Sequence, residues 1–518
     1  MPSRLPCSRL KLDELFVHWL LLPDSQKFAF KLIDDAKEGK PLHSVALATP
    51  GANGVALSPT SSATMYPPLS PGKSASPGPF VPSPLRKLSQ SRSSGSKRES
   101  DKEQEIPQFY FPRGKPPPED QLQVVLAKKK ELFAAAKGPG LNLEGFVTMV
   151  QDVLEMPTSV AYVLFDRLAP MEKDTVSEAE FDAWCAGCDA LTVSRVHRLW
   201  TILRGPENDY LQYDDFVPVV RAVINTHPGL EFLKDTPEFQ DRYQETVIYR
   251  ILYTVNRSDT GRITLKELHR SDLLEALTRV DEEEDINKVL RYFSYEHFYV
   301  IYCKFWELDS DHDFMIDKDA LLRYGNHSLT YRIVDRIFDQ VPRKFRCQTP
   351  GRMGYEDFVW FILSEEDKTT DMALAYWFRC VDLHGDNLIT QDEAAFFYEE
   401  QVHRMENLMH EPVLFEDIVC QLTDMVKPER DGLFTLRDLK RSRQHAGVLF
   451  NCLFNINKFI AFENRDPFLA RQQEQEAPQL SQWDRFAAAE YLQLAMDEEG
   501  EDAEDAGLSE TLEVAAGL

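Results

Sequence analysis

Between residues 106 and 459, apolar residues recur at the three- and four-residue intervals that are typical of amphipathic α-helices. Clear stripes of this kind are Phe298, Ile301, Tyr302 and Phe305, then Leu374, Trp377, Phe378 and Val381, and finally Ala394, Phe397 and Tyr398. A further helical pattern lies at 483–491, closer to the C-terminus. The sequence therefore predicts an all-α fold.

Two short polar segments between these helices place oxygen atoms at alternate positions. In segment 309–320, positions one, three, five, seven and nine are Asp309, Asp311, Asp313, Met315 and Asp317. In segment 382–393, positions one, three, five, seven, nine and twelve are Asp382, His384, Asp386, Leu388, Thr390 and Glu393. Ca²⁺ takes six to eight oxygen ligands, and the EF-hand loop supplies them at these positions, using the backbone carbonyl at position seven. We therefore predict two EF-hand loops, called loop 1 (309–320) and loop 2 (382–393), with Ca²⁺ as the cofactor.

Both loops depart from the EF-hand consensus. Loop 1 has Ala320 at position twelve, where a bidentate carboxylate belongs, and Phe314 at position six, where glycine is usual. Loop 2 has His384 at position three, and imidazole is a poor ligand for a hard cation. Asn387, at position six, tolerates a left-handed backbone. We expect weakened calcium affinity in both loops, and either loop could instead be kept for the fold without metal.

The end of these loops is repeated along the chain as an apolar position eight, a polar position nine and an apolar residue five after position eight. Position eight falls at Leu141, Val176, Leu211, Ile263, Ile316, Met353, Ile389 and Phe434. The trailing apolar residues are Phe146, Phe181, Phe216, Leu268, Leu321, Phe358, Ala394 and Leu439. We predict an elongated array of up to eight EF-hand and EF-hand-like units, paired through short strands at position eight, most of them without calcium ligands.

Composition restricts the possible partners. The net charge of −27 and the pI near 4.9 argue against nucleic acid or anionic membranes as primary partners. No apolar run approaches the ~18 residues that a membrane span requires, and acidic residues interrupt the first apolar stretch, so neither a span nor a signal peptide is expected. Eight cysteines in 518 residues, mostly in helical contexts, indicate reduced thiols and an intracellular protein, cytoplasmic or nuclear.

The two ends of the chain differ from its middle. Residues 1–37 predict an amphipathic helical segment, either core or docking site, and 38–105 form a Ser/Pro-rich linker that we expect to be disordered. Ser70 and Ser83 in this linker precede prolines near basic residues, so both are possible phosphorylation sites. After the helical segment 461–496, the tail 497–518 is acidic and is also expected to be disordered.

Several segments of the helical region resemble one family. They are Pro-Gln-Phe-Tyr-Phe-Pro-Arg-Gly at 107–114, Thr-His-Pro-Gly-Leu at 226–230, Tyr-Phe-Ser-Tyr-Glu-His-Phe-Tyr at 292–299, Asp-Phe-Val-Trp-Phe at 357–361, Tyr-Trp-Phe-Arg-Cys at 376–380 and Leu-Arg-Asp-Leu-Lys-Arg at 436–441. Together, and in this order, they are similar to the B-double-prime regulatory subunits of protein phosphatase 2A.

The resemblance implies a non-catalytic subunit that joins the phosphatase scaffold and catalytic subunits in a heterotrimer, responds to calcium and selects phosphoprotein substrates. It divides the helical region into a lobe at 106–285, expected to contact the scaffold, and a lobe at 286–460 that contains both calcium loops. The family's calcium ligands carry over to this chain at Asp309, Asp311, Asp313, Asp317, Asp382, Asp386, Thr390 and Glu393. Ala320 and His384 depart from the family pattern.

Two other functions remain open from the sequence. Gly325-Asn326-His327 is similar to one element of metal-dependent phosphatases, but the companion Gly-Asp-x-His-Gly and Gly-Asp-x-x-Asp-Arg-Gly motifs that hold two metals are absent from the sequence. Gly325 is better explained as the end of a helix, so we do not expect an enzyme. A stand-alone EF-hand sensor or adaptor with an unknown partner is the alternative to a phosphatase subunit.

Overall fold

The computed structural model describes residues 114–136, 138–169, 173–466 and 479–497, together with three isolated positions before residue 40. The predicted N-terminal helix, the linker with Ser70 and Ser83, and the acidic tail after 497 lie outside the described residues. The α-helices are α3 Glu119–Ala135, α4 Leu143–Met149, α5 Thr158–Leu168, α6 Glu178–Cys188, α7 Arg195–Leu203, α8 Tyr213–Thr226, α9 Pro237–Val255, α10 Leu265–Leu268, α11 Leu273–Glu282, α12 Tyr295–Trp306, α13 Lys318–Leu322, α14 Tyr324–His327, α15 Tyr331–Phe338, α16 Tyr355–Glu366, α17 Asp371–Val381, α18 Gln391–Asn407, α19 Phe415–Val426, α20 Leu436–Arg441, α21 Arg443–Phe454 and α22 Ile456–Glu463. The other elements are the π-helix η2 Val150–Leu154, the 3₁₀-helices η3 Pro228–Asp235 and η4 Ile286–Lys288, and the strands β1 Met315–Ile316 and β2 Met353–Gly354. A helix without a label covers 482–497.

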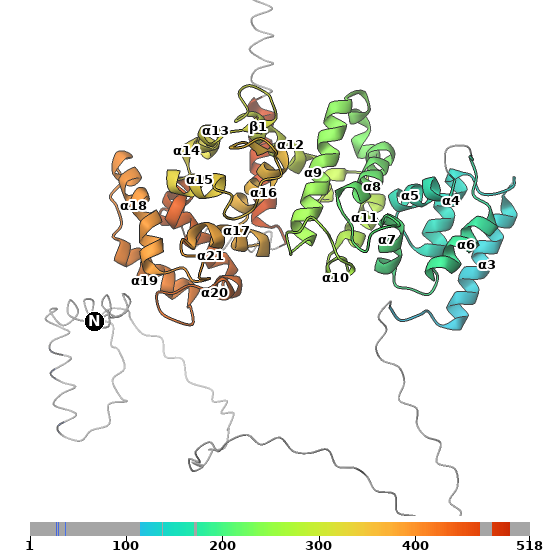
Figure 1. Ribbon diagram of the computed structural model, residues 1–518, viewed down its shortest axis with the longest axis horizontal. Helices are drawn as coiled ribbons and strands as arrows, with labels where there is room; N and C mark the ends of the chain where they lie inside the picture. Colours follow the sequence, from blue (N-terminus) through green and yellow to red (C-terminus); the bar gives the residue numbers. More distant parts are fainter. Residues whose placement is uncertain are drawn as a thin grey trace, which may run out of the picture. The chain divides into compact units, whose positions relative to one another are not determined.

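The helix-loop-helix units are joined in pairs through position eight of their loops. In chain order, Leu141 bridges Val176, Leu211 bridges Ile263, Ile316 of β1 pairs with Met353 of β2, and Ile389 bridges Phe434, all antiparallel. These are the eight positions predicted from the repeat, and their pairing is confirmed. The four pairs follow one another in chain order in Figure 1, from α3–α6 through α7–α10 and α12–α16 to α17–α20.

The repeated apolar residues form the core of each pair. The trailing residue of every unit is at most 4% exposed, including Phe146, Phe216, Phe358 and Leu439 at 0%. Burial of apolar surface of this kind stabilises a protein by roughly 25 cal/mol per Å². The same residues sit one turn inside the second helix of each unit, so the pairing strand and the core contact are set by a single short motif.

The end of the described chain packs back onto the third pair. Trp483 of the 482–497 helix is 6% exposed and donates from its indole nitrogen to Nδ1 of His297 on α12, at 3.2 Å. Further along, Glu490 pairs with Lys304 at 2.7 Å. The helix predicted at 483–491 is confirmed, and it is tied to the helix that leads into loop 1.

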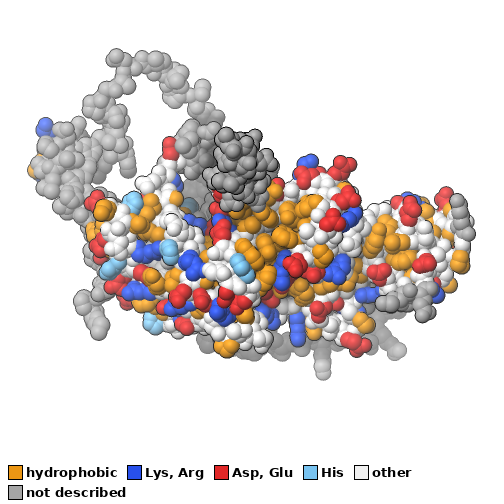
Figure 2. All heavy atoms as spheres, turned by 90° about the horizontal axis from the view of Figure 1, so that it is seen from above, with side chains coloured by type: hydrophobic (Ala, Val, Ile, Leu, Met, Phe, Trp, Pro, Cys, Tyr) orange, Lys and Arg blue, Asp and Glu red, His pale blue; other side chains and the backbone are white. Residues whose placement is uncertain are grey.

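Aromatic residues line the outer side of α12 at helical spacing. Tyr295, Tyr299 and Tyr302 are partly exposed, and Trp306 is 39% exposed. Hydrophobic side chains gather near the middle of the face drawn in Figure 2, whereas acidic and basic side chains are mixed over the rest of it.

None of the described helices is both long enough and apolar enough to cross a membrane.

Candidate calcium site

The first three predicted ligands of loop 1 come together in the structure. Asp309 is 1% exposed, and its carboxylate accepts hydrogen bonds from the backbone N–H groups of Asp313 (3.2 Å) and Phe314 (2.9 Å). These bonds wrap the loop around the carboxylate. As a result, one ligand oxygen each from Asp309, Asp311 and Asp313 lies within 4.8 Å of the others. Burial raises the pKa of Asp309, and the nearby acids Asp311 and Asp313 act in the same direction.

The remaining positions of loop 1 serve the fold. Asp317 accepts a hydrogen bond from the N–H of Ala320 at 2.8 Å and so caps α13, while Met315 lies in β1. Asp317 is not one of the three clustered carboxylates. Ala320 is buried, and Arg323 donates from its guanidinium to the carbonyl of Leu308 and the hydroxyl of Ser310, both at 2.9 Å.

An acid at position twelve ties the loop together in other units. Glu267 accepts from the N–H groups of Ser258 and Thr264, which are positions three and nine of its unit. Asp438 makes the same two contacts, to Glu429 and Thr435. This carboxylate therefore closes loops that lack a full ligand set. Loop 1 has lost it at Ala320, where Arg323 links the start of the loop to α13 instead.

Loop 2 keeps this carboxylate, and its partners include the predicted weak ligand. Oε1 of Glu393 accepts from the N–H of Leu383 (2.8 Å), the N–H of His384 (3.1 Å) and Nδ1 of the His384 ring (2.8 Å). Although burial opposes it, hydrogen bonds from Thr390 and His384 lower the pKa of Glu393, so it is ionised at neutral pH. The hydrogen bond to Glu393 in turn raises the pKa of His384, so the ring is held on the carboxylate of position twelve.

The first half of loop 2 has the shape of a calcium loop. Asp382 accepts from the N–H groups of Gly385 (2.7 Å) and Asn387 (2.9 Å), and Asp386 accepts from that of Leu388 (3.0 Å). Gly385 and Asn387 have φ of 69° and 64°. The left-handed backbone predicted for Asn387 is therefore confirmed. Within the described part of the chain, however, only loop 1 brings three His, Cys, Asp or Glu ligand atoms this close.

Phe314, at position six of loop 1, takes the conformation for which glycine is usual. Its φ is 59°, a region that bulky side chains rarely enter and that costs about 1–3 kcal/mol. The ring compensates through contacts: it stacks near Phe305, with centroids 6.1 Å apart, and the guanidinium of Arg242 lies 4.1 Å above it. Arg242 belongs to α9, in the second pair of units. The backbone of loop 1 is thereby linked to the preceding pair, a contact for which the sequence contains no local signal.

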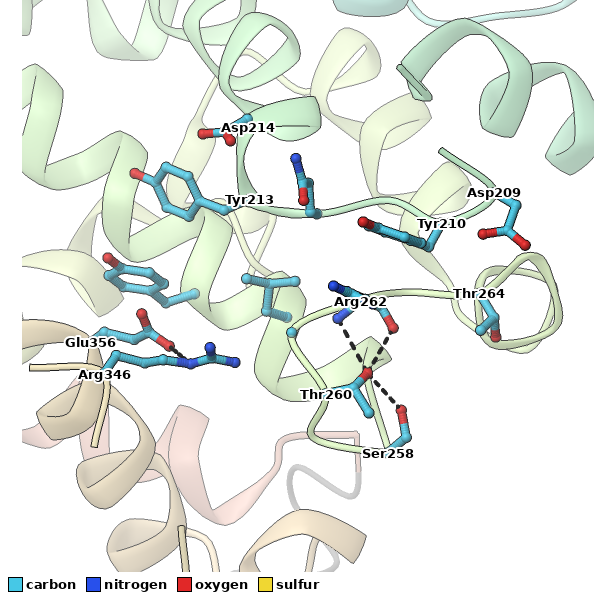
Figure 3. Close-up of a pocket in the computed structure, with 14 residues that line it drawn as sticks. Asp209, Tyr210, Tyr213, Asp214, Ser258, Thr260, Arg262, Thr264, Arg346 and Glu356 are labelled. Carbon is cyan, nitrogen blue, oxygen red and sulfur yellow. Dashed lines mark hydrogen bonds and ion pairs between the residues drawn. The ribbon is translucent and has the colours of Figure 1, made fainter. Parts of the chain in front are cut away.

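The loop at 256–267 shows how a unit without carboxylates at positions one, three and five keeps its shape. The Thr260 hydroxyl contacts the hydroxyl of Ser258 at 3.2 Å and the carbonyl of Arg262 at 3.1 Å (Figure 3). Hydroxyl groups thus occupy the positions where loop 1 has aspartates, and they bond to one another. Beside this loop is a hollow of about 720 Å³, into which Arg346 reaches from the third pair and contacts Glu356 (Figure 3).

Two further features of the sequence, Gly325 and a Cys-x-x-Cys segment, can be compared with the structure. Gly325 has a φ of 58° and ends the helical segment after α13, which agrees with its expected role. The sequence also contains Trp184-Cys185-Ala186-Gly187-Cys188, a Cys-x-x-Cys segment of the kind found in redox sites. Burial raises the pKa of Cys185 to about 12, opposite to what such a site requires.

Four pairs of helix-loop-helix units, one with a cluster of aspartates at the ligand positions, define an EF-hand protein. Accordingly, a family model described as an EF-hand domain matches residues 194–283, and one described as an EF-hand domain pair matches 298–399. Two relatives that are 51% and 38% identical over nearly the whole chain are B'' regulatory subunits of protein phosphatase 2A. The chain therefore belongs to this family, and it is a non-catalytic subunit.

Two relatives cover nearly the whole chain. A probable B''delta regulatory subunit of serine/threonine protein phosphatase 2A from Arabidopsis thaliana is 51% identical, over 95% of this chain and 92% of that protein. The beta form of the human (Homo sapiens) B'' regulatory subunit is 38% identical, over 96% of this chain and 90% of that protein. A chain of a solved PP2A PR70 holoenzyme is 48% identical and covers 52% of this chain and 98% of its own length, with a TM-score of 0.48.

Restoring the acid at position twelve of loop 1 should strengthen calcium binding. Ala320 is the third residue of α13 and follows the cap residue Asp317, as Glu393 follows Thr390 in α18. We predict that Ala320→Glu raises the affinity of loop 1 about tenfold, or about 1.4 kcal/mol, because a bidentate ligand is added. Calorimetric titration with calcium, in a chain whose loop 2 is disabled by Asp382→Asn, measures it. Unchanged affinity would contradict the assignment of Ala320 to the ligand position.

Proposed function

We propose that this chain binds the scaffold and catalytic subunits of protein phosphatase 2A, delivers phosphoprotein substrates to them and responds to Ca²⁺ through loops 1 and 2. Membership of the B'' family supports the phosphatase partners. The observation that carries the calcium response is the cluster of Asp309, Asp311 and Asp313, because three carboxylates on alternate residues are an oxygen donor set suited to a hard cation.

The donor sets of the two loops fit calcium unequally. In loop 1 the ion would be held by Asp309, Asp311, Asp313 and the Met315 carbonyl, and Asp317 would have to leave its cap or act through water. In loop 2 the ligands would be Asp382, Asp386, the Leu388 carbonyl, Thr390 and Glu393, with His384 outside the set. Bound calcium supplies positive charge that neutralises these carboxylates.

Contacts within the chain connect loop 1 to the helices α12 and α9. Asp309 comes shortly after the end of α12 at Trp306, and the Phe314 ring contacts Arg242 of α9. A change in the loop backbone on calcium binding would therefore act on the angle between α12 and α13 and on the contact with α9. We infer that this alters the surface that the scaffold or the catalytic subunit contacts.

We also infer an intracellular location, cytoplasmic or nuclear. Cys185, Cys188, Cys347, Cys380 and Cys452 are free thiols, which fits a reducing compartment. Phosphorylation of Ser70 and Ser83, which lie outside the described residues, remains a proposal based on the sequence.

Recovery of the phosphatase from cell lysate tests the proposal. Tagged chain should retain scaffold and catalytic subunits in equal molar amounts, and the amount should change when calcium is replaced by a chelator. The double variant Asp309→Asn, Asp382→Asn should retain the same subunits without that change. If neither subunit is recovered in either condition, the chain is an EF-hand adaptor with another partner.

A further inference from the structure

A second cavity, of about 730 Å³, lies away from both calcium loops. Its walls come from α9, α11 and α16, from the segment 288–292, from the residues just before α17, from the start of α21 and from residues 479–484 at the end of the described chain. We call it the basic pocket, because five cationic side chains line it: Arg250, Arg279, Lys288, Arg291 and Arg443. Three acidic residues, Asp272, Asp367 and Asp484, also line it, which leaves a net charge of +2 (five minus three) in a chain of net charge −27.

Arg250 is the buried member of this group. It is 6% exposed, and its guanidinium donates to the carbonyls of Tyr292 (2.7 Å) and Leu290 (3.0 Å) and to Nδ1 of His297 (2.8 Å). All three acceptors are neutral, because the same Nδ1 also accepts from Trp483 and burial holds the pKa of His297 well below its usual value. Among the described residues, no carboxylate forms an ion pair with this guanidinium. A buried charge without a counter-ion is expensive, and burial lowers the pKa of Arg250 to about 10.

The three acidic side chains of the pocket already have hydrogen-bond or ion-pair partners within the chain. Asp272 pairs with Arg291 at 2.8 Å, and Asp367 accepts from both the N–H and the hydroxyl of Thr369. Asp484 accepts from the N–H of Ser481 and is 3.9 Å from His297, so it attracts Arg250 only from a greater distance.

The rim, by contrast, has cations with spare donors. Lys288 has a 65% exposed side chain and lies 3.9 Å from Glu283, and Arg443 is 46% exposed although it pairs with Asp371 at 2.7 Å. Within the described chain, Arg279 makes no ion pair. The same pocket thus contains a buried guanidinium without an ion pair and exposed cations that can contact a further anion.

We propose that the basic pocket binds a small organic polyanion that carries phosphoryl groups. Guanidinium groups bind phosphoryl oxygens through paired, charge-assisted hydrogen bonds, and the volume lies in the range of small-molecule sites. Thr254, Thr370 and Ser481 line the same walls, and hydroxyl groups are donors that suit phosphoryl oxygens. The same chemistry could come from a soluble metabolite or from the head group of a phosphoinositide lipid.

The test uses the full chain, without calcium, and myo-inositol hexakisphosphate as the probe. Titration calorimetry should show saturable binding, and the fluorescence of Trp483, which lines the pocket, should change with it and cease to change in Trp483→Phe. The variant Arg279→Ala, Lys288→Ala removes two exposed rim charges and should weaken binding at least tenfold. The matched control Arg221→Ala, Lys234→Ala removes two surface cations outside the pocket and should have little effect.

Three results would overturn the proposal. The first is the absence of saturable binding up to about 1 mM probe. The second is equal weakening by the rim pair and the control pair, which would mean that the probe binds charge in general. The third is a tenfold gain in affinity when residues 498–518 are removed, because the acidic tail, and not a small molecule, would then be the occupant.

A second experiment, with lipid vesicles, distinguishes the two sources of the phosphoryl groups. Phosphatidylcholine vesicles containing phosphatidylinositol bisphosphate should retain the chain only if a head group can enter the pocket, and the rim pair should abolish that retention. Binding of the soluble probe without vesicle binding would support a soluble metabolite as the ligand.

Discussion

Replacing Asp309 with asparagine should weaken calcium binding at loop 1 about 100-fold, or about 2.7 kcal/mol. Asp309 is the buried member of the aspartate cluster, and both of its oxygens accept backbone N–H groups of the loop. Asparagine has nearly the same shape but lacks the charge, and its amide nitrogen cannot accept from Asp313 or Phe314. The substitution therefore removes the charge of a ligand and one of the two acceptors that hold the turn, which gathers the other ligands.

The measurement is a calorimetric calcium titration of Asp309→Asn in the Asp382→Asn background, where loop 1 is the remaining site. Asp319→Asn is the matched control, since Asp319 is an acid of the same loop, at position eleven in the first turn of α13. We expect it to leave the affinity nearly unchanged. If Asp319→Asn weakens binding as much as Asp309→Asn, then Asp319 has replaced the missing acid at position twelve and the ligand set given for loop 1 is wrong.

The pairing of the units could be predicted from the sequence because its signal is local. An apolar residue at position eight and another five residues later mark a short strand and the first turn of the next helix. All eight positions found in this way pair as expected, from Leu141 with Val176 to Ile389 with Phe434. The signal for the ligands at the start of loop 1 is local as well, since alternate residues of a tight loop face one centre.

What the sequence did not predict depends on contacts between distant residues. Trp483 and His297 are 186 positions apart, and Phe314 is held by Arg242 from another pair of units. No periodic pattern links such residues. Asp317 illustrates a second limit: the same side chain can be a calcium ligand or a helix cap, and in the structure it caps α13.

Glu365→Gln should reduce the free energy of unfolding by about 3–5 kcal/mol, because it breaks a buried ion pair from one side. Glu365, near the end of α16, is fully buried, and its Oε1 lies 2.6 Å from Nζ of Lys368 and 3.0 Å from Nζ of Lys458 on α22. It also accepts from the amide of Asn455 at 2.7 Å. Burial already lowers the pKa of Lys368 to about 7, so this ammonium depends on the carboxylate for its charge.

Denaturant unfolding of Glu365→Gln against the unaltered chain measures this loss. The control is Glu399→Gln, which breaks an exposed pair with Arg332 at 2.9 Å and should cost less than about 1 kcal/mol. The double variant Glu365→Gln, Lys368→Met separates charge from packing, because it removes the ammonium that the single variant leaves buried, close to the rings of Trp377 and Phe454. Partial recovery of stability is expected. A double variant less stable than the single one would show that Lys368 contributes through its own contacts and not through its pairing with Glu365.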